Sequence, residues 1–337
     1  MAVLTKLAHL AGILGRGLLS TDFPILAHLI VTRRCNLNCA YCNEYDAHSD
    51  SVPLEALRSR IAALARLRTA IVTLSGGEPT LHPELPAVIR AIRDAGMSAS
   101  MITNGFLLTR ERIEAFGAAG LQGLQISIDN VVPDEISKKS LKTLDRKLQL
   151  LARYASFPVN INSVLGISEE RTADAVTVAK RAVQLGFSST VGVLHDGNGV
   201  LKPLGERQRR AYQQIVALSG WPQRINYRLF QKNLLEGKPN DWKCRAGGRY
   251  LYVCEDGLVH WCSQQRGYPG IPVEQYTIED LRREFNTRKD CAPHCTVSCV
   301  HQASLLDNWR PKQRIPDPAA LRQGLPTLVQ LGAARQQ

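Results

Sequence analysis

Short apolar runs alternate with amphipathic runs along the first two thirds of the chain. The short runs predict six β-strands, at residues 26–31, 70–74, 98–103, 123–128, 159–165 and 189–194. Between them, and after the last, apolar residues recur about every 3.6 positions, which is the period of an amphipathic helix. This period predicts helices at about residues 53–67, 83–95, 109–118, 133–154, 169–186 and 205–219.

Six strand–helix units in succession predict a parallel sheet with right-handed crossovers, and therefore an α/β fold. In a barrel of such units, the loops that follow the strands gather at one face, where the chemistry is carried out. This favours a barrel here, although a doubly wound sheet would share part of the pattern. The residues of interest at or near strand ends are Cys35, Gly76, Asn104, Asp129, Asn162 and His195.

The pattern changes after about residue 220. Two short strands, 249–254 and 258–262, flank the turn Glu255-Asp256-Gly257 and predict a hairpin. A helix near 277–286 and a cysteine group at 291–299 follow. We therefore expect four parts: an N-terminal amphipathic helix (1–22), a barrel core (23–220), a small cysteine-rich α+β extension (221–310) and a tail (311–337).

Residues 2–19 predict a helix with an apolar stripe made of Leu4, Leu7, Ala11, Leu14 and Leu18. We favour a helix that packs on the main domain. The alternative is a peripheral membrane contact, or a cap over a lipid-like substrate. Since we find neither a cleavable signal peptide nor an apolar run that could span a bilayer, we expect a cytoplasmic protein, membrane-associated at most through this helix.

The net charge of the chain bears on its binding partners. A net charge of +12 suits an anionic partner, such as an acidic substrate or a membrane surface. Aromatic residues make up only 6%, and no dense Lys/Arg block contains aromatics, so we expect no nucleic-acid partner. The predicted helix 133–154 carries a basic face, most simply a solvated surface, made of Lys138, Lys139, Lys142, Arg146 and Lys147.

Three of the nine cysteines, Cys35, Cys39 and Cys42, stand close together after the first strand. In an intracellular protein this favours metal ligands over disulfides. Three thiolates can hold three irons of a cubane [4Fe–4S] cluster and leave the fourth iron open. A structural zinc site needs four ligands and a ferredoxin cluster usually has four cysteines, whereas the next cysteine here is Cys244. Buried structural thiols are not expected in a polar loop.

A second motif, Gly76-Gly77-Glu78-Pro79, directly follows the second strand. Two glycines let the backbone approach a ligand closely, and Glu78 offers an acceptor. Alone, this turn is an ordinary strand–turn–helix junction. One strand after a cysteine loop, it is much more specific.

With these motifs, the sequence resembles the radical S-adenosylmethionine (SAM) superfamily over roughly residues 24–200. The segments Thr103-Asn104-Gly105 and Ser127-Ile128-Asp129 add to the resemblance. It implies a partial (β/α)6 barrel, similar to a TIM barrel. It also implies that Cys35, Cys39 and Cys42 hold the catalytic cluster and that SAM chelates the open iron through its amino and carboxylate groups.

The resemblance further implies the cofactor-binding residues. The turn Gly76–Pro79 would meet the amino group of SAM, and Tyr41 would lie near adenine. Ser127 and polar residues near it would hold the ribose and the carboxylate. Asn130 follows Asp129 where relatives often have glycine, a difference at the floor of the pocket. The full set is Tyr41, Gly76, Gly77, Glu78, Pro79, Asn104, Ser127, Asp129 and Asn162.

A second cysteine constellation lies in the extension. The run Cys244…Gly257…Cys262 is similar to the hairpin of SPASM and twitch extensions, which bind auxiliary [4Fe–4S] clusters. We predict one auxiliary cluster, held by Cys244 and Cys262 together with Cys291, Cys295 and Cys299 as the source of the remaining ligands. His294 and His301 are less favoured ligands. Cys254 is left over, either a small buried hydrophobe or a hydrogen-atom donor or spare ligand.

The resemblance implies an enzyme that generates a 5′-deoxyadenosyl radical from SAM and abstracts hydrogen from an unactivated C–H bond. A reducing partner such as flavodoxin or ferredoxin would supply the electron. We expect a small-molecule or lipid-like substrate, because the N-terminal segment is short for a peptide-recognition domain. The alternatives are a maturase of ribosomally made peptides and a non-enzymatic iron–sulfur electron carrier. A zinc-stabilised nucleic-acid-binding protein fits the open triad poorly.

Overall fold

The structure is a computed structural model that describes residues 11–13, 15–166, 168–194 and 203–310. Its first part alternates strands and helices as the sequence predicts. The elements are β1 (Leu26–Thr32), α2 (Leu54–Arg66), β2 (Ile71–Gly76), α3 (Leu85–Asp94), β3 (Ser98–Thr103), α4 (Arg110–Ala118), β4 (Gly123–Ile128), α5 (Leu141–Tyr154), β5 (Val159–Leu165), α6 (Thr172–Gln184), β6 (Ser188–Val193) and α7 (Glu206–Leu218).

The later part is helical at first and then forms a small sheet extension. A π-helical turn at Tyr227–Gln231 joins two short helices, and 3-10 turns stand at Pro79–Leu81, Val273–Gln275 and Ala292–His294. The remaining elements are α8 (Trp221–Asn226), α9 (Lys232–Leu235), β7 (Tyr250–Val253), β8 (Leu258–Cys262), β9 (Gln265–Pro272), α10 (Ile278–Asn286) and α11 (Ser298–Leu305).

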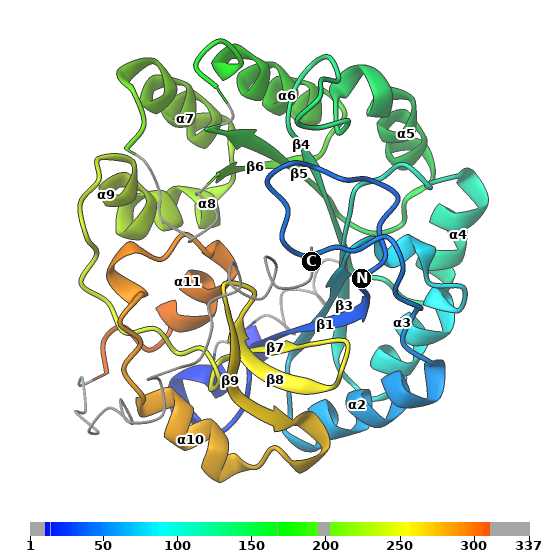
Figure 1. Ribbon diagram of the computed structural model, residues 1–337, viewed down its shortest axis with the longest axis vertical. Helices are drawn as coiled ribbons and strands as arrows, with labels where there is room; N and C mark the ends of the chain where they lie inside the picture. Colours follow the sequence, from blue (N-terminus) through cyan, green and yellow to red (C-terminus); the bar gives the residue numbers. More distant parts are fainter. Residues whose placement is uncertain (1–10, 14, 167, 195–202, 311–337) are drawn as a thin grey trace.

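The nine strands of the described residues form one sheet in the order β6-β5-β4-β3-β2-β1-β7-β8-β9. Strands β1 to β6 are parallel, β7 adds to β1 in parallel, and β8 and β9 return antiparallel. Helices α2 to α7 cover the outside of the curved sheet, while α8, α9 and α11 lie on the side between β6 and the β7–β9 hairpins (Figure 1). The protein is thus a partial (β/α)6 barrel, whose sheet continues into the extension.

The two faces of the barrel strands differ in polarity. Side chains that point outward, such as Leu74, Ile126 and Ile161, are fully buried in one apolar core beneath the helices. Along β3 and β4, every second residue is instead only half-buried. These residues point into the barrel and are largely polar. The interior is therefore a polar space rather than a packed apolar core.

The predicted helix at 133–154 begins too early. Helix α5 starts at Leu141, after Ser140, whose hydroxyl accepts the amide hydrogen of Thr143 and caps the helix. The residues before it form a loop that is held to the cysteine loop by a hydrogen bond from Ala40 N to Ile136 O (3.0 Å). Lys138 and Lys139 consequently lie in this loop and not on the helix face that we predicted.

The described part of the N-terminal segment is helical at residues 11–13 and 15–19. It packs through Ile13, which is buried, and through Gly17, whose carbonyl accepts a hydrogen bond from the buried Arg249. Ala11 and Leu18 are exposed, so these two residues of the predicted apolar stripe do not pack on the main domain. None of the described helices is both long and apolar enough to serve as a transmembrane segment. His195 and the tail lie outside the described residues.

Candidate cluster and cofactor site

The loop after β1 carries the predicted triad of cysteines. Its two ends are tied together, because Cys35 N donates to Asp46 O (3.1 Å) and Asp46 N donates to Arg33 O (2.9 Å). Within the loop, Cys42 N donates to Cys39 O (3.0 Å). Cys39 is buried, Cys35 and Cys42 are half-buried, and all three thiols are free of disulfides. The loop thus presents three available sulfur ligands from one closed turn.

The glycine turn after β2 lies directly beneath the cysteine loop. Gly77 N donates to Thr32 O and Glu78 N donates to Arg34 O, both at 2.9 Å. A Cβ added to Gly77 would stand 2.3 Å from Arg33 O, which is far inside van der Waals contact. The glycines are therefore needed for the close approach of two backbones. The structure shows this close approach toward the cysteine loop, and the contact of the turn with the amino group of SAM stays a prediction.

Glu78 joins this turn to the next strand. Its carboxylate is buried and accepts hydrogen bonds from the hydroxyls of Thr80 and Thr103 (2.5 Å each) and from Asn104 N (2.7 Å). Asn104 in turn donates through Nδ2 to Asn36 Oδ1 (2.8 Å), with Cys35 Sγ at 3.8 Å. The carboxylate therefore links the end of β2 to the end of β3.

A second cluster of polar side chains lies beside Cys39 and Cys42. The Tyr41 hydroxyl donates to Asp129 Oδ2 (2.5 Å), and Lys139 Nζ lies 3.4 Å from the same oxygen. Burial and the neighbouring carboxylate of Asp129 raise the pKa of Tyr41, so its phenol stays protonated. The other Asp129 oxygen and both polar side-chain atoms of Asn130 are buried without a partner among the described residues. Such unsatisfied groups are suited to a bound polar ligand.

Lys139 is a site residue that the sequence reasoning missed. Its side chain is 13% exposed and lies over the Tyr41 ring, 5.1 Å from the centroid. The periodicity of 133–154 suggested a helix and so placed this lysine on a solvated face. The cap at Ser140 is the signal that could have separated the loop from the helix.

The thiols of the loop are poised to lose protons on metal binding. Burial raises the pKa of Cys42 to about 11 and raises that of Cys35 as well. Both therefore stay protonated at neutral pH until a metal supplies the compensating positive charge. The residues present fit an iron–sulfur cluster with three protein ligands.

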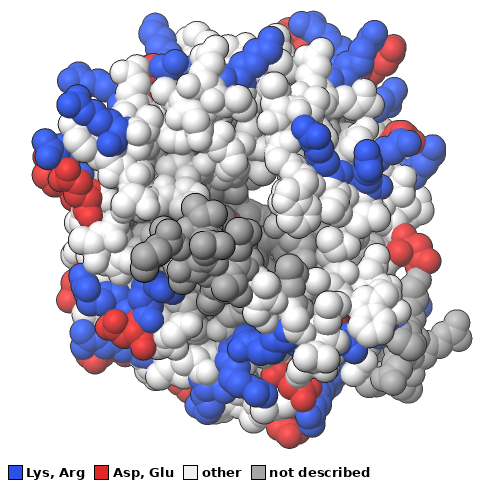
Figure 2. All heavy atoms as spheres, turned by 180° about the vertical axis from the view of Figure 1, so that it is seen from behind, with Lys and Arg blue, Asp and Glu red and all other residues white. Residues whose placement is uncertain are grey.

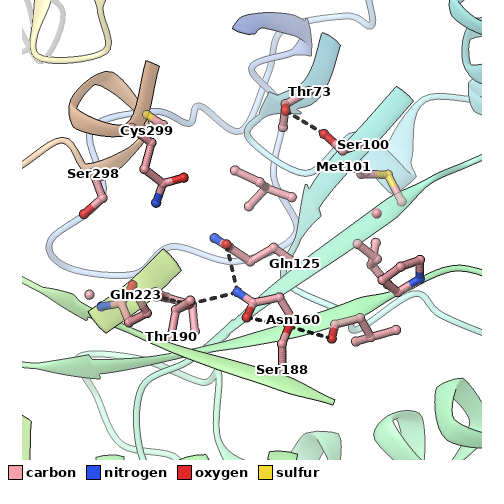
Figure 3. A pocket seen from close by; sticks show the side chains of 18 of the residues that line it. Thr73, Ser100, Met101, Gln125, Asn160, Ser188, Thr190, Gln223, Ser298 and Cys299 are labelled. Atoms are coloured by element: carbon pink, nitrogen blue, oxygen red, sulfur yellow. Dashed lines mark hydrogen bonds between the residues drawn. The ribbon is translucent and has the colours of Figure 1, made fainter. Parts of the chain in front are cut away.

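Ser127 and Asn162 stand opposite each other on β4 and β5. Both are half-buried and belong to the inward-facing set of side chains. Thr190 on β6 donates to Asn162 Oδ1 (3.0 Å). Asn162 also lines a cavity of about 450 Å³ inside the barrel (Figure 3). Both side chains thus face the barrel interior, and their contact with the cofactor stays a prediction.

The cavity runs along β1 to β6, mostly but not entirely in the amino-terminal halves of these strands. Figure 3 shows polar side chains of β2 to β6 on one side and Ser298 and Cys299 of α11 on the other. Residues more than 200 positions apart, such as Thr73 and Cys299, therefore line one space. The sequence alone did not indicate this cavity.

Five of the six cysteines of the extension form the predicted auxiliary group. Burial raises the pKa of Cys295 well above its usual value, and the nearby thiols of Cys244, Cys262 and Cys291 raise it further. These four thiols therefore share one neighbourhood. Cys299 also lies near Cys244, its sulfur accepts a hydrogen bond from the buried Tyr250 hydroxyl, and it lines the barrel cavity. Which four of the five hold a cluster remains a prediction.

His294 and His301, the less favoured ligand candidates, flank this group. His301 is buried and its ring stacks on Phe230 (4.4 Å between centroids) and meets Trp242 edge-on (4.8 Å). Burial lowers its pKa to about 4, so the ring is neutral. It packs among aromatic side chains, with both ring nitrogens buried without a hydrogen-bond partner among the described residues, and its role as a ligand stays a prediction.

Cys254 is buried but not apolar in its contacts. Its sulfur accepts from Arg33 Nη2 (2.7 Å) and its thiol donates to Glu255 Oε2 (2.8 Å). Among the described residues, Cys254, Asp256 and His260 form the one group of three donor atoms within 4.8 Å of one another. However, His260 Nδ1 accepts the Gly267 amide hydrogen, so the proton of a neutral ring sits on Nε2. With that tautomer and Arg33 alongside, these residues are poorly suited to a cation.

The two cysteine groups are spread more widely than ligands of a single ion. Neither supplies three sulfur atoms that all lie within 4.8 Å of one another among the described residues. Thiolates around one zinc ion lie about 3.8 Å apart, given a Zn–S bond of about 2.3 Å. A polynuclear cluster is the better match for both groups.

Comparison with known proteins agrees with the superfamily that the sequence motifs indicate. The profile of the Radical SAM superfamily matches residues 29–197. A PqqA peptide cyclase from Ruegeria pomeroyi is 26% identical over 276 residues, covering 77% of this chain and 73% of that protein. An AdoMet-dependent heme synthase from Methanosarcina barkeri is 33% identical over 175 residues, covering 49% of each.

The solved structure of Streptococcus suis SuiB bound to its precursor peptide SuiA resembles the fold. The match has a TM-score of 0.60 at 12% identity and covers 87% of this chain and 74% of that one. Among the curated relatives, the matches to the heme synthase and to a PqqA peptide cyclase from Bradyrhizobium diazoefficiens span only 49% and 39% of those proteins. The likeness to SuiB shows the fold.

Proposed function

The chain belongs to the radical SAM superfamily, and from this premise we propose that it is an enzyme that uses SAM to modify a peptide held in its barrel. Cys35, Cys39 and Cys42 would hold a [4Fe–4S] cluster. When bound, the cluster and SAM supply a 5′-deoxyadenosyl radical that takes a hydrogen atom from a C–H bond. The chain's own residues position these groups and exclude water.

Several side chains have defined tasks in this proposal. Gly76 and Gly77 allow the backbone after β2 to pack closely against the cysteine loop. Glu78 fixes the end of the neighbouring strand β3 through its hydrogen bond with Asn104 N. The unpartnered oxygen of Asp129 and the amide of Asn130 would bind polar groups of SAM. Lys139 would balance negative charge near Cys42, a role that its proximity supports. Tyr41, Asn104, Ser127 and Asn162 complete the predicted cofactor pocket.

The observation that carries the proposal is the position of the cavity. Asn162 of the predicted cofactor pocket lines it, and Cys299 of the auxiliary group lines it too. A substrate in this space would lie between the site where the radical forms and the group that could accept an electron from the substrate radical. This arrangement would allow the auxiliary cluster to take an electron from the substrate radical, so that the substrate is oxidised or cross-linked overall.

A peptide is the better supported substrate class. The match to the PqqA peptide cyclase extends over 276 residues, beyond the core that the superfamily profile covers. It therefore includes part of the extension, whereas the match to the heme synthase is 175 residues long. The expected small-molecule or lipid-like substrate has less support than this alternative. A flavodoxin or ferredoxin remains the proposed electron donor, and the net charge of +12 favours an acidic donor.

Anaerobic reconstitution with iron and sulfide, followed by dithionite and SAM, tests the proposal. The wild-type enzyme should release 5′-deoxyadenosine, and Cys35→Ala, Cys39→Ala and Cys42→Ala should each abolish the release. Cys254→Ala is the matched control, because it removes a cysteine that we assign to neither cluster. If the wild type releases no 5′-deoxyadenosine, the proposed activity is wrong. If SAM does not change the EPR signal of the reduced cluster, an electron carrier is the better interpretation.

A further inference from the structure

Resting on the proposed function, we propose that the barrel cavity selects an uncharged, hydrogen-bonding side chain of the peptide and rejects charged ones. Gln125, Asn160 and Thr190 would make that selection. All three line the cavity, on three adjacent strands. The proposal names a property of the substrate that no motif in the chain indicates.

The three side chains are held in fixed orientations. Asn160 Nδ2 donates both to Gln125 Oε1 (3.1 Å) and to Thr190 Oγ1 (2.8 Å). Its own oxygen accepts from the Ser188 hydroxyl (3.0 Å), and Thr190 donates onward to Asn162 (3.0 Å). Figure 3 shows this chain of bonds along one wall. Since both hydrogens of the Asn160 amide are used within the wall, Asn160 orients its neighbours.

Gln125 has hydrogen-bond donors that are available to a ligand. Its oxygen is engaged by Asn160, and its amide nitrogen has no partner in the hydrogen bonds found among the described residues. In Figure 3 the Gln125 amide extends into the cavity toward Ser298 and Cys299. A preorganised amide donor of this kind matches a carbonyl or hydroxyl oxygen on the ligand.

The cavity offers no charge for a charged ligand to pair with. Its lining, within the described part of the chain, contains hydroxyls, amides, apolar side chains and a thiol, but neither Asp, Glu, Lys nor Arg. The one histidine of the lining, His28, is half-buried in the barrel wall, and desolvation there lowers its pKa to about 4, so it is neutral at pH 7. Placing an unpaired charge in such a space is strongly unfavourable.

The opposite wall is also neutral. Ser298 accepts a hydrogen bond from Gln231 (3.1 Å), and Gln223 donates to the Tyr212 hydroxyl (3.3 Å). In Figure 2, which shows the face opposite to that of Figure 1, coloured side chains lie mainly around the rim, and the hollowed centre is largely white or grey. On this face, the Lys and Arg side chains of the described residues thus lie mainly outside the hollow.

The test uses the reconstituted, SAM-loaded enzyme and an equimolar pool of capped pentapeptides, each with four glycines around one variable central residue. Peptides retained by the enzyme are identified by mass spectrometry. For the wild type, we expect central Asn, Gln, Ser and Thr to be retained at least about tenfold more than central Asp, Glu, Lys and Arg. Binding is read out directly, so the result does not depend on turnover.

Gln125→Glu places one negative charge in the cavity. We expect it to reverse the selection, so that Lys and Arg peptides are retained about tenfold more than in the wild type. Gln122→Glu is the matched control, because it makes the same chemical change at an exposed position three residues away and should leave the selection unchanged. Thr190→Val, which removes one hydroxyl with little change in shape, should lower the retention of neutral polar peptides.

Two results would overturn the inference. One is that the wild type retains charged peptides as well as neutral ones, or retains none of them. The other is that Gln125→Glu behaves as Gln122→Glu does while keeping the wild-type iron content. The proposed function fails separately, because an enzyme that binds neutral peptides selectively but releases no 5′-deoxyadenosine would contradict only the activity.

Discussion

Arg33 and Glu255 form an ion pair of 2.6 Å although 222 positions separate them in the chain. Arg33 immediately precedes the cysteine loop, and Glu255 lies in the turn between β7 and β8. The same guanidinium donates to Glu44 Oε2 (2.6 Å) at the far end of that loop and reaches the Cys254 sulfur (2.7 Å). Tyr252 donates to Glu44 as well (2.5 Å). The hairpin of the extension thereby fixes both ends of the loop that carries the first cysteine triad.

Replacing Arg33 with methionine should therefore destabilise the protein and impair the first cluster. The Arg33 side chain is 5% exposed, and its loss would leave two carboxylates without a counter-charge. The expected loss in the free energy of unfolding is about 3–5 kcal/mol. It is measured by urea denaturation of the metal-free protein, and the EPR signal of the reconstituted protein reports on the cluster.

Arg58→Met is the control for Arg33→Met. Arg58 forms an exposed pair with Glu55 (2.7 Å), which is worth less than about 1 kcal/mol. Arg33→Lys should recover only part of the stability, because an ammonium cannot bridge three partners as the planar guanidinium does. Equal effects of Arg33→Met and Arg58→Met would show that the contacts of Arg33 do not hold the cysteine loop.

Gly77→Ala should remove the first cluster and spare the auxiliary one. The added Cβ would lie 2.3 Å from Arg33 O and 2.4 Å from Arg34 O, so the cysteine loop must shift. We expect about half of the wild-type iron after reconstitution and no release of 5′-deoxyadenosine. Gly15→Ala, whose Cβ would meet nothing within 4 Å, is the control. Full iron loading in Gly77→Ala would contradict this explanation of the turn.

The strands could be predicted closely because each is a short apolar run between clear turn signals. Their bounds in the structure differ from the predicted ones by two residues at most, and Gly76 and Asn104 stand at strand ends as predicted. The superfamily motifs could be found for a similar reason, since they are local in sequence. Local patterns thus determine both the barrel and the position of the cysteine loop.

What could not be predicted depends on contacts between distant segments. Strand β9 (Gln265–Pro272) contains two prolines and three glycines or charged residues, so its composition resembles a loop, and only pairing with β8 makes it a strand. The contacts of Arg33 with the hairpin and the lining of the neutral cavity each bring together residues from both halves of the chain. No periodicity within one segment can report such contacts.

The auxiliary site makes a prediction about iron content. If Cys244, Cys262, Cys291 and Cys295 hold the auxiliary cluster, replacing any one of them with alanine should lower the iron to about half of the wild-type content. Cys299→Ala should then keep nearly all of the iron, because the four other thiolates would already bind the four irons of the cluster. Iron and sulfide analysis of the reconstituted variants measures this. Loss of half the iron in Cys299→Ala, together with full iron in Cys291→Ala, would exchange the two assignments.

His28 should make the stability of the metal-free protein sensitive to acid. The ring lies inside the barrel, 5.3 Å from that of Tyr250, and burial lowers its pKa from 6.5 to about 4. Between these values the unfolded chain binds a proton that the folded protein does not, so folding stability falls as the pH drops below 6.5. By pH 5, this one group should lower the free energy of unfolding by about 2 kcal/mol relative to pH 7.

The measurement compares urea denaturation of the wild type and of His28→Gln at pH 7 and pH 5. Other groups also titrate in this range, but they are common to both proteins, so the difference between the two pH dependences isolates His28. The variant should lose about 2 kcal/mol less than the wild type on acidification. His48→Gln, at an exposed histidine, should behave as the wild type does. Equal losses in the wild type and His28→Gln would mean that His28 is solvated, and the neutral character of the cavity would lose one of its supports.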